Sequence, residues 1–222
     1  MENNYGETIK FWENIFSEEK EYNPEKQIGV EALERGIQWV ACDSEAVIDF
    51  GCGNGVMLLR CISEGAERVY GIDLSNNAIA LGQKVIDNYK LQDRASLICG
   101  SVEKIKELES NSFSGAILSN IIDNLIPEDS KQVLEEIHRV LEPNGKLLLK
   151  FNPYLEKELR EEYELKEISE EFYKETTGLY LWNLKEEKIK ELIAPYFAIE
   201  KYEIVEFKEY DQINRMYYLR AK

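Results

Sequence analysis

The segment VIDFGCGNG, residues 47–55, constrains the fold of this 222-residue chain more than any other. An apolar run typical of a buried strand ends at Phe50, and three glycines follow at positions 51, 53 and 55. An apolar helical pattern, GVMLLRCISEG, begins at once. Glycine permits positive φ angles and close approach of a ligand, and a helix N-terminus offers unpaired N–H groups. The segment therefore predicts a strand, a tight turn that can cradle a ligand, and a helix.

The chain around this segment alternates short apolar runs with longer amphipathic ones, which predicts strands separated by helices. Two of the runs, Ile117-Leu118 and Leu147 to Leu149, are apolar without alternation, as in parallel strands that helices cover on both faces. The fold class is therefore α/β, with a sheet between two helix layers. We expect its strands at residues 46–50, 68–73, 95–99, 113–119 and 145–151.

Capping residues place two helices between these strands. Ser75 can cap the helix of SNNAIALGQKVIDNYK, and Pro127 stands in the first turn of PEDSKQVLEEIHRVL, where proline is tolerated. We expect the second helix to stop at Pro143-Asn144-Gly145.

The segments on either side of this core depart from its rhythm. Residues 1–42 hold a helical pattern with aromatic residues, GETIKFWENIF, and a second helix that we expect to open at Asn23-Pro24. Residues 153–184 are rich in glutamate and tyrosine. After a helix at about 185–194, two alternating runs predict an antiparallel hairpin joined by residues 208–212. No repeat or linker divides the chain, so we expect residues 1–222 to form a single domain.

The charge balance argues against several classes of partner. The chain has 27 basic and 43 acidic residues, a net charge of −16, and a field of this sign repels nucleic acids and anionic membranes. Its four cysteines lie too far apart for a CxxC pair and it has one histidine, so we expect no metal site. The polar start MENNYGETIK and the absence of a long apolar run predict a cytoplasmic protein with free thiols.

A second acidic residue completes the ligand site predicted at the glycine turn. The run RVYGID ends in Asp73, 18 positions after Gly55, and the carboxyl ends of neighbouring parallel strands meet at one edge of the sheet. A carboxylate there can accept hydrogen bonds from both hydroxyls of a ribose. The dinucleotide fingerprint GxGxxG would need a third glycine where Val56 stands. The pattern thus predicts a nucleoside site that differs from an NAD site.

These motifs resemble those of the class I S-adenosylmethionine-dependent methyltransferases. VIDFGCGNG is similar to the glycine motif of that family and GIDLS, residues 71–75, to its acidic strand end. FSGAILSNIIDNL (113–125) and HRVLEPNGKLLLKF (138–151) resemble two further signatures of the small-molecule branch. The resemblance covers about residues 47–152. It implies a doubly wound, Rossmann-like, mostly parallel seven-stranded sheet with a C-terminal antiparallel hairpin, and S-adenosylmethionine as cofactor.

The resemblance also implies roles for single residues. Asp49, Gly51 and Gly53 would hold the methionine part of the cofactor and Asp73 its ribose. The adenine would lie against Leu74, near Ser101, which stands where the family usually has an acidic residue. The full set of implied cofactor-binding residues is Asp49, Gly51, Cys52, Gly53, Asp73, Leu74, Ser101, Val102 and Ser119.

Within the single domain, the resemblance makes residues 1–42 a lid, 43–152 the cofactor-binding core, 153–184 a substrate-covering insertion and 185–222 the final helix and hairpin. Tyr5, Trp12 and Tyr180 would then wall a small substrate, although ordinary packing would also account for aromatic residues in these segments. Residues 155–175, with nine glutamates and four basic residues, predict a solvated helix face that would favour a cationic substrate.

No residue stands out as a catalytic base. Methyl transfer is an in-line displacement in which positioning supplies most of the catalysis and a base is optional. Asp123, in the loop after the fourth strand, is the candidate for chemistry, with a solvated loop residue as the alternative. His138 is expected to complement a helix end. A small-molecule methyltransferase is the reading that we favour. An aminopropyltransferase-like enzyme and a non-catalytic S-adenosylmethionine-binding module remain open alternatives.

Overall fold

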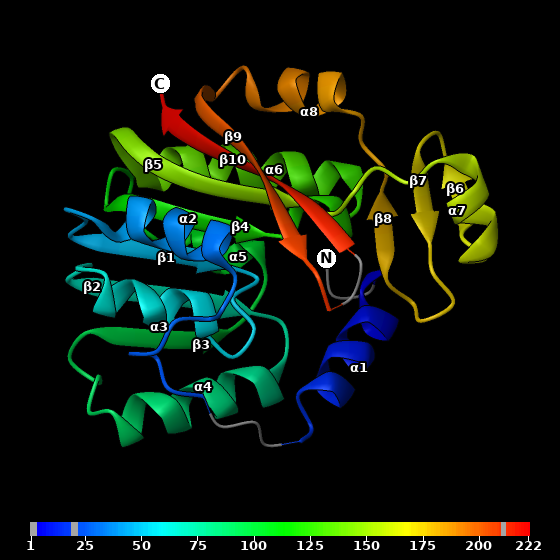
Figure 1. The fold of residues 1–222 in the computed structure, drawn as a ribbon. Coiled ribbons are helices and arrows are strands. Elements are labelled where there is room, and N and C mark those ends of the chain that lie inside the picture. The colour runs from blue at the N-terminus through cyan, green and yellow to red at the C-terminus, as the bar shows by residue number, and fades with distance from the viewer. Residues whose placement is uncertain (1–3, 19–21, 210–211) are drawn as a thin grey trace.

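The computed structural model describes residues 4–18, 22–209 and 212–222, and a seven-stranded sheet runs through its centre (Figure 1). The strand order is β3-β2-β1-β4-β5-β10-β9. The first five strands in this order pair in parallel, while β10 runs antiparallel to both of its neighbours. The predicted sheet and its C-terminal hairpin are therefore confirmed. The strands are β1 (Ala46–Phe50), β2 (Arg68–Asp73), β3 (Ala95–Cys99), β4 (Phe113–Ser119), β5 (Leu141–Phe151), β9 (Phe197–Phe207) and β10 (Gln212–Ala221).

Helices cover both faces of the sheet, which is why its central strands are apolar on both sides. A hydrophobic core lies on each face of the sheet, and successive residues of β1 point into different cores. Val47 belongs to the core formed with α2, α3 and α4, and Ile48 to the core formed with α5, α6 and α8. Figure 1 shows α2 and α3 in front of the sheet and α6 behind it. The helices are α2 (Glu31–Ala41), α3 (Val56–Ser63), α4 (Asn76–Asn88), α5 (Val102–Lys106), α6 (Pro127–Val140) and α8 (Glu186–Ile193).

Local signals set most of the helix ends. The Ser75 hydroxyl accepts the Ala78 amide at 3.1 Å and caps α4, as predicted, and Pro127 lies in the first turn of α6. Two expected boundaries are wrong. Asn23 opens a turn in which its side chain accepts the Glu25 amide at 2.8 Å, so α2 begins only at Glu31. The second error is at the end of α6, which stops at Val140 because β5 already begins at Leu141.

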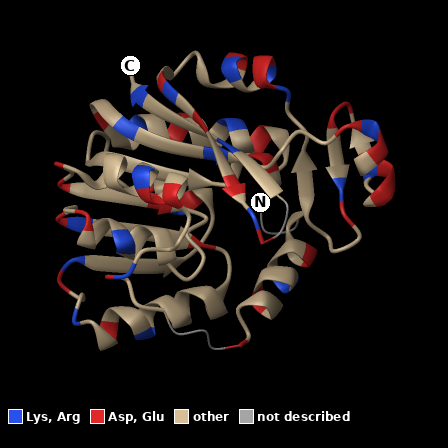
Figure 2. Cartoon of the chain, viewed as in Figure 1, with Lys and Arg blue, Asp and Glu red and all other residues tan. Residues whose placement is uncertain are grey.

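The insertion between β5 and α8 is built differently from its expectation. A short helix, α7 (Lys157–Glu162), precedes a separate antiparallel sheet of β6 (Lys166–Ser169), β7 (Phe172–Lys174) and β8 (Tyr180–Trp182). The expectation of a helix face over 155–175 is therefore wrong for most of that stretch. Acidic residues do lie along α7 (Figure 2), and α7 buries none of its residues. The small sheet lies to one side of the seven-stranded sheet (Figure 1).

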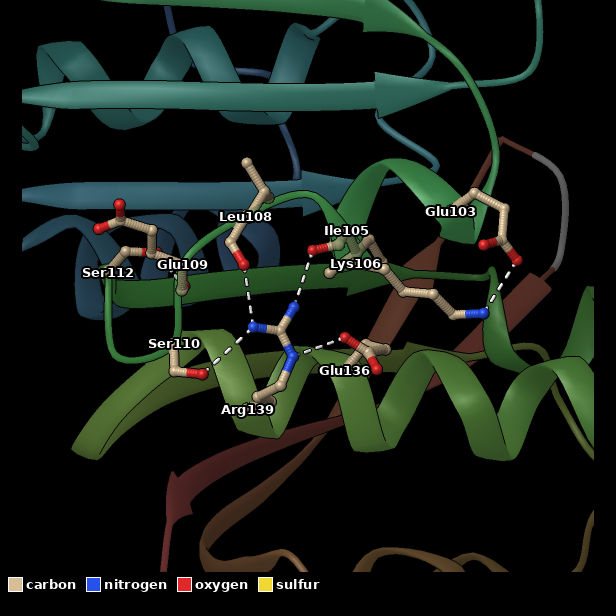
Figure 3. Close-up of polar contacts among 9 residues, drawn as sticks. All are labelled: Glu103, Ile105, Lys106, Leu108, Glu109, Ser110, Ser112, Glu136 and Arg139. Atoms are coloured by element: carbon tan, nitrogen blue, oxygen red, sulfur yellow. Dashed lines mark hydrogen bonds and ion pairs between the residues drawn. The ribbon is translucent and has the colours of Figure 1, made fainter.

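Arg139 ties the helix that follows β3 to the core (Figure 3). From α6 its guanidinium donates to the carbonyls of Ile105 and Leu108, each at 2.9 Å, and to the Ser110 hydroxyl at 3.2 Å. Glu136 accepts its Nε–H at 2.7 Å. Ile105 belongs to the last turn of the five-residue α5, and Leu108 lies just beyond its end. The guanidinium thereby fixes α5, whose first residues stand at the carboxyl edge of the sheet.

Two further observations concern the chain as a whole. The connection predicted at 208–212 includes residues 210 and 211, which lie outside the described residues. Among the helices that the structure describes, none combines the length and the apolar character that crossing a membrane would require.

Candidate functional site

A cavity of about 280 Å³ opens at the carboxyl ends of β1, β2 and β4, and we refer to it as the loop cavity. Ten of the residues singled out from the sequence line it: Tyr5, Trp12, Asp49, Gly51, Cys52, Gly53, Asp73, Leu74, Ser101 and Ser119. They come from four separate strand ends or helix starts and from α1 (Gly6–Ile15), so the fold brings distant parts of the chain to one place. This is the edge of an open α/β sheet at which ligands commonly bind.

The glycine turn forms the floor of the loop cavity. Gly51, Gly53 and Gly55 all have positive φ, at 79°, 54° and 84°, a backbone region that other residues rarely adopt. A Cβ on Gly51 would lie 2.9 Å from the Ile121 side chain, so the turn also needs the missing side chain there. The Gly51 amide donates to the Ile72 carbonyl at 2.8 Å, which holds the turn against the end of β2.

Asp49 presents a buried carboxylate to the loop cavity. It is 2% exposed, and its Oδ1 has no hydrogen-bond partner among the described residues. Burial, with the nearby Asp73 as a smaller cause, raises the pKa of Asp49 well above its usual value. A buried acceptor without a donor is costly unless a ligand supplies one. The atom is therefore placed to accept from a cationic or N–H-bearing group in the cavity.

Asp73 holds the glycine turn from the neighbouring strand. Its Oδ2 accepts the Gly53 amide at 2.7 Å, and its Oδ1 accepts the Ser75 amide at 2.9 Å. Burial raises the pKa of Asp73, while these backbone N–H groups act in the opposite direction. The carboxylate still lines the cavity, so it can bind a ligand hydroxyl in addition to its structural role.

Helix α1 crosses the loop cavity as a strap. At its start, the Tyr5 hydroxyl donates to Asp129 at 2.8 Å, and the Thr8 hydroxyl donates to the Gly178 carbonyl beside the small sheet at 3.0 Å. At its far end, Glu13 accepts the backbone amides of Asn76 and Asn77 at 2.8 and 3.0 Å, where α4 begins. The strap thus joins the insertion to the start of α4, and its Trp12 forms part of the cavity wall.

A second and larger cavity, of about 1000 Å³, adjoins the loop cavity, and we refer to it as the outer cavity. The two share Trp12, Asn120 and Asn124 in their walls. The insertion supplies much of the outer cavity, including Tyr154, Leu165 and Leu181, and the start of β10 supplies the opposite side. A compound in the outer cavity would therefore lie directly next to a ligand in the loop cavity.

An amide cluster that the sequence analysis missed lies where the two cavities meet. Asn120 donates from Nδ2 to the Asn152 side chain at 2.5 Å, and its Oδ1 accepts from Lys150 and, at 3.0 Å, from Asn214. Asn120 itself has a φ of 54°, a strained conformation at the end of β4. These residues come from the ends of β4 and β5 and the start of β10, so no local motif joins them. The one available signal in the sequence was Asn152, which directly follows the leucine-rich run of β5.

Three of the predicted site residues do not line the loop cavity. Asp123 was expected in a loop facing the reacting group; instead it is 1% exposed, and its Oδ2 accepts the Asn152 amide at 2.6 Å. Burial raises its pKa to about 6. The alternative of a solvated loop residue is also wrong. The Val102 side chain is buried in the core, and Tyr180 packs edge-on against Tyr5 with ring centroids 5.8 Å apart.

Other expected features can be placed in the same way. His138 lies near the end of α6, within 3.3 Å of the carbonyl of Lys222 and against the Phe197 ring. Of the glutamates at 155–175, only Glu175 lines the outer cavity. Within residues 4–18, 22–209 and 212–222, no group of three or more His, Cys, Asp or Glu side chains could hold a metal ion.

Comparison with known proteins decides the family. Residues 48–149, which contain the glycine turn, Asp73 and the ends of β4 and β5, match the model of a family described as a methyltransferase domain. They are a class I S-adenosylmethionine-dependent methyltransferase domain. S-adenosylmethionine is the cofactor of such a domain, and the unpaired Asp49 oxygen and the left-handed glycines of the loop cavity fit it.

The similar proteins act on different acceptors. The methyltransferase domain is 27% identical over 116 residues to the ribosomal protein L11 methyltransferase of Vibrio parahaemolyticus, which covers 51% of this chain and 36% of that protein. The chain thus spans about a third of the length of that relative. Two solved structures share the fold, each with a TM-score of 0.68. One is 1,6-didemethyltoxoflavin-N1-methyltransferase of Burkholderia thailandensis, at 15% identity over 99% of this chain and 86% of that one. The other is magnesium protoporphyrin IX methyltransferase of Synechocystis, at 16% identity over 99% and 97%.

Proposed function

We propose that this chain transfers the methyl group of S-adenosylmethionine to a small-molecule acceptor. The observation that carries the proposal is the pair of adjoining cavities: one is built on the glycine turn, and the other shares Trp12 and Asn120 with it as wall residues. A transferase needs a place for the donor and a place for the acceptor with no wall between the reacting groups. The loop cavity would hold the cofactor and the outer cavity the acceptor.

The loop cavity offers a contact for each part of the cofactor. Asp49 would accept from the ammonium group of its methionine part, with Gly51, Cys52 and Gly53 allowing close approach. Asp73 would accept from the ribose hydroxyls. Leu74 and Ser101 would lie beside the adenine, and Ser119 beside the methionine part. The sulfonium of the bound cofactor supplies an activated methyl group, and the residues around it need mainly to hold and orient the two reactants.

The strap and the insertion would contribute by excluding water. Trp12 belongs to the walls of both cavities, and its helix is held at each end by hydrogen bonds to a different part of the protein. Closure of such a segment over bound reactants keeps water from the reacting groups and completes the acceptor site. We propose that α1 acts as the lid and that residues 153–184 cover the acceptor.

Two observations favour a small acceptor over a nucleic acid, a membrane or a protein. The net charge of −16 opposes anionic polymers and lipid surfaces. The outer cavity is bounded by the strap, the insertion and β10, and its volume suits a small organic compound. The similarity to the ribosomal protein methyltransferase covers about half of this chain and about a third of that protein. A cytoplasmic location would suit the four cysteines, none of which the structure pairs in a disulfide.

A screen with radiolabelled S-adenosylmethionine tests the proposal. Phenols, carboxylates, amines and an L11-type protein would be offered as acceptors, and label in a small-molecule product is the expected result. Label in the protein alone would overturn the small-molecule assignment. Transfer of an aminopropyl group from decarboxylated S-adenosylmethionine would favour the aminopropyltransferase alternative. Cofactor binding without transfer to any acceptor class would favour a binding module.

A further inference from the structure

Lys150 is the feature of the outer cavity that the proposed function leaves unexplained. It lies near the end of β5, is 7% exposed, and is the one basic side chain among the described residues that line this cavity. Lysine is rarely buried to this extent without a partner. A cation held in the wall of a cavity therefore points to a ligand that compensates for its burial.

Lys150 has no ion pair among the residues that the structure describes. Its ammonium donates to the Asn120 side-chain oxygen and lies 5.5 Å from the centre of the Phe207 ring. With the amide of Asn214 turned over, that side chain would accept a second hydrogen bond at 3.2 Å. An ammonium has three N–H donors, so at least one remains for a ligand.

The nearest buried carboxylate to Lys150 is that of Asp123, and Arg215 shares it. Asp123 attracts both Lys150 and Arg215, but its carboxylate accepts the Asn152 amide and forms no ion pair with either. Arg215 donates to the carbonyls of Asn152 and Leu184, which are neutral. Two cations therefore share one buried carboxylate. Burial lowers the pKa of Lys150 to about 8, so the amine still carries its charge at neutral pH.

The rest of the outer cavity is suited to an apolar body. Aromatic and aliphatic side chains form most of its wall, and the other charged residue in it is Glu175. Apolar walls with a few polar groups at fixed positions are typical of small-molecule sites, in which the polar groups set the orientation. The aromatic and aliphatic members of the wall are Trp12, Tyr154, Leu159, Tyr163, Leu165 and Phe207, among others.

We propose that the acceptor is a largely apolar compound with a negatively charged oxygen group, and that Lys150 and the adjoining asparagines bind this group. The inference rests on the proposed function, because it assigns the outer cavity to the acceptor. It replaces the expectation of a cationic substrate, which rested on glutamates that mostly face away from the cavity. Lys150 is a binding residue in this account, and orienting the anionic group beside Asn120 places the acceptor next to the loop cavity.

Two fluorescent probes that differ in one charged group test the inference. The probes are 8-anilino-1-naphthalenesulfonate and the neutral N-phenyl-1-naphthylamine, titrated with and without saturating S-adenosylhomocysteine. Lys150→Met should weaken binding of the sulfonate about ten-fold or more, the usual effect of losing a hydrogen bond to a charged group. Binding of the neutral probe should change less than about two-fold. Lys150→Arg should retain most of the preference for the sulfonate over the neutral probe.

Controls separate this result from general effects on the fold. Lys146→Met removes a lysine from the same strand whose amine reaches the Cys42 carbonyl at the other end of the sheet, and it should change neither probe. Lys150→Gln is a second neutral variant in case Lys150→Met does not fold. Equal loss of both probes, or no loss of the sulfonate, would overturn the inference. Calorimetry with S-adenosylhomocysteine on the same proteins distinguishes the failures, since absent binding there would refute the proposed function instead.

Discussion

Replacing Asp49 with asparagine should change cofactor affinity and stability in opposite directions. The substitution keeps the shape of the side chain and removes the charge from a carboxylate that is 2% exposed and has an unpaired Oδ1. If this oxygen accepts from the ammonium group of the cofactor, its loss should cost about 1.5–3 kcal/mol, the usual contribution of a hydrogen bond to a charged group. The affinity for S-adenosylhomocysteine should then fall about ten- to a hundred-fold.

The stability of the ligand-free protein should show the other half of the effect. Burial raises the pKa of Asp49 above its value in the unfolded chain, so the folded state favours the protonated form. The contribution of Asp49 to the free energy of unfolding is largest below about pH 4, and it is lost as the pH rises toward the folded-state pKa. Asp49→Asn should therefore match the stability of the wild type near pH 4 and be more stable than the wild type at pH 7.

Calorimetry with S-adenosylhomocysteine and urea unfolding at the two pH values measure both effects. Asp93→Asn, in an exposed turn before β3, is the matched control and should alter neither quantity. Wild-type affinity in a folded Asp49→Asn protein would refute the assignment of this carboxylate to the cofactor. A loss of stability at pH 7 would refute the argument from burial.

Three other substitutions test separate parts of the site. Gly53→Val places a side chain in the loop cavity at a φ of 54° and should abolish S-adenosylhomocysteine binding. Gly29→Val is its control: this residue has a φ of 90° in open space, so the substitution adds backbone strain alone and should leave binding intact. Asp123→Asn should retain transfer activity within a few-fold, because this residue does not line the loop cavity; a loss of several hundred-fold without unfolding would restore it as a catalytic residue. Glu13→Ala removes the acceptor for the first amides of α4 and should make the closed position of the strap less stable by about 1 kcal/mol. Trypsin should then cleave faster after Lys10 in the presence of S-adenosylhomocysteine, and cleavage at the wild-type rate would contradict a role as lid.

Four of the sheet strands could be predicted to the residue because their burial leaves a clear trace in the sequence. β1 to β4 begin and end where their apolar runs do, and the hydroxyl of Ser75 caps α4 as its position suggested. The small sheet of the insertion was missed, since β6 is fully exposed and β7 and β8 have three residues each, too few for a periodic pattern.

The residues of the loop cavity could be predicted from the sequence and those of the outer cavity could not, for a physical reason. The glycine turn and Asp73 lie in one continuous strand–helix–strand unit, so their spacing alone brings them together. Lys150 and Asn120 meet because β4 pairs in parallel with β5, and Asn214 joins them only because β10 pairs antiparallel with β5, with Arg215 opposite Phe151. Nothing in the local sequence specifies that register. Asp123 was misplaced for a related reason, because its partner is the amide of Asn152, 29 residues away.

The central claim is that the loop cavity binds S-adenosylmethionine, and calorimetric titration of the wild-type chain with S-adenosylhomocysteine and, separately, with NAD tests it most directly. The account predicts that S-adenosylhomocysteine binds one molecule per chain and that NAD does not bind, because Val56 stands where a dinucleotide site has its third glycine. Tight binding of NAD, or no binding of S-adenosylhomocysteine to the folded protein, would contradict it.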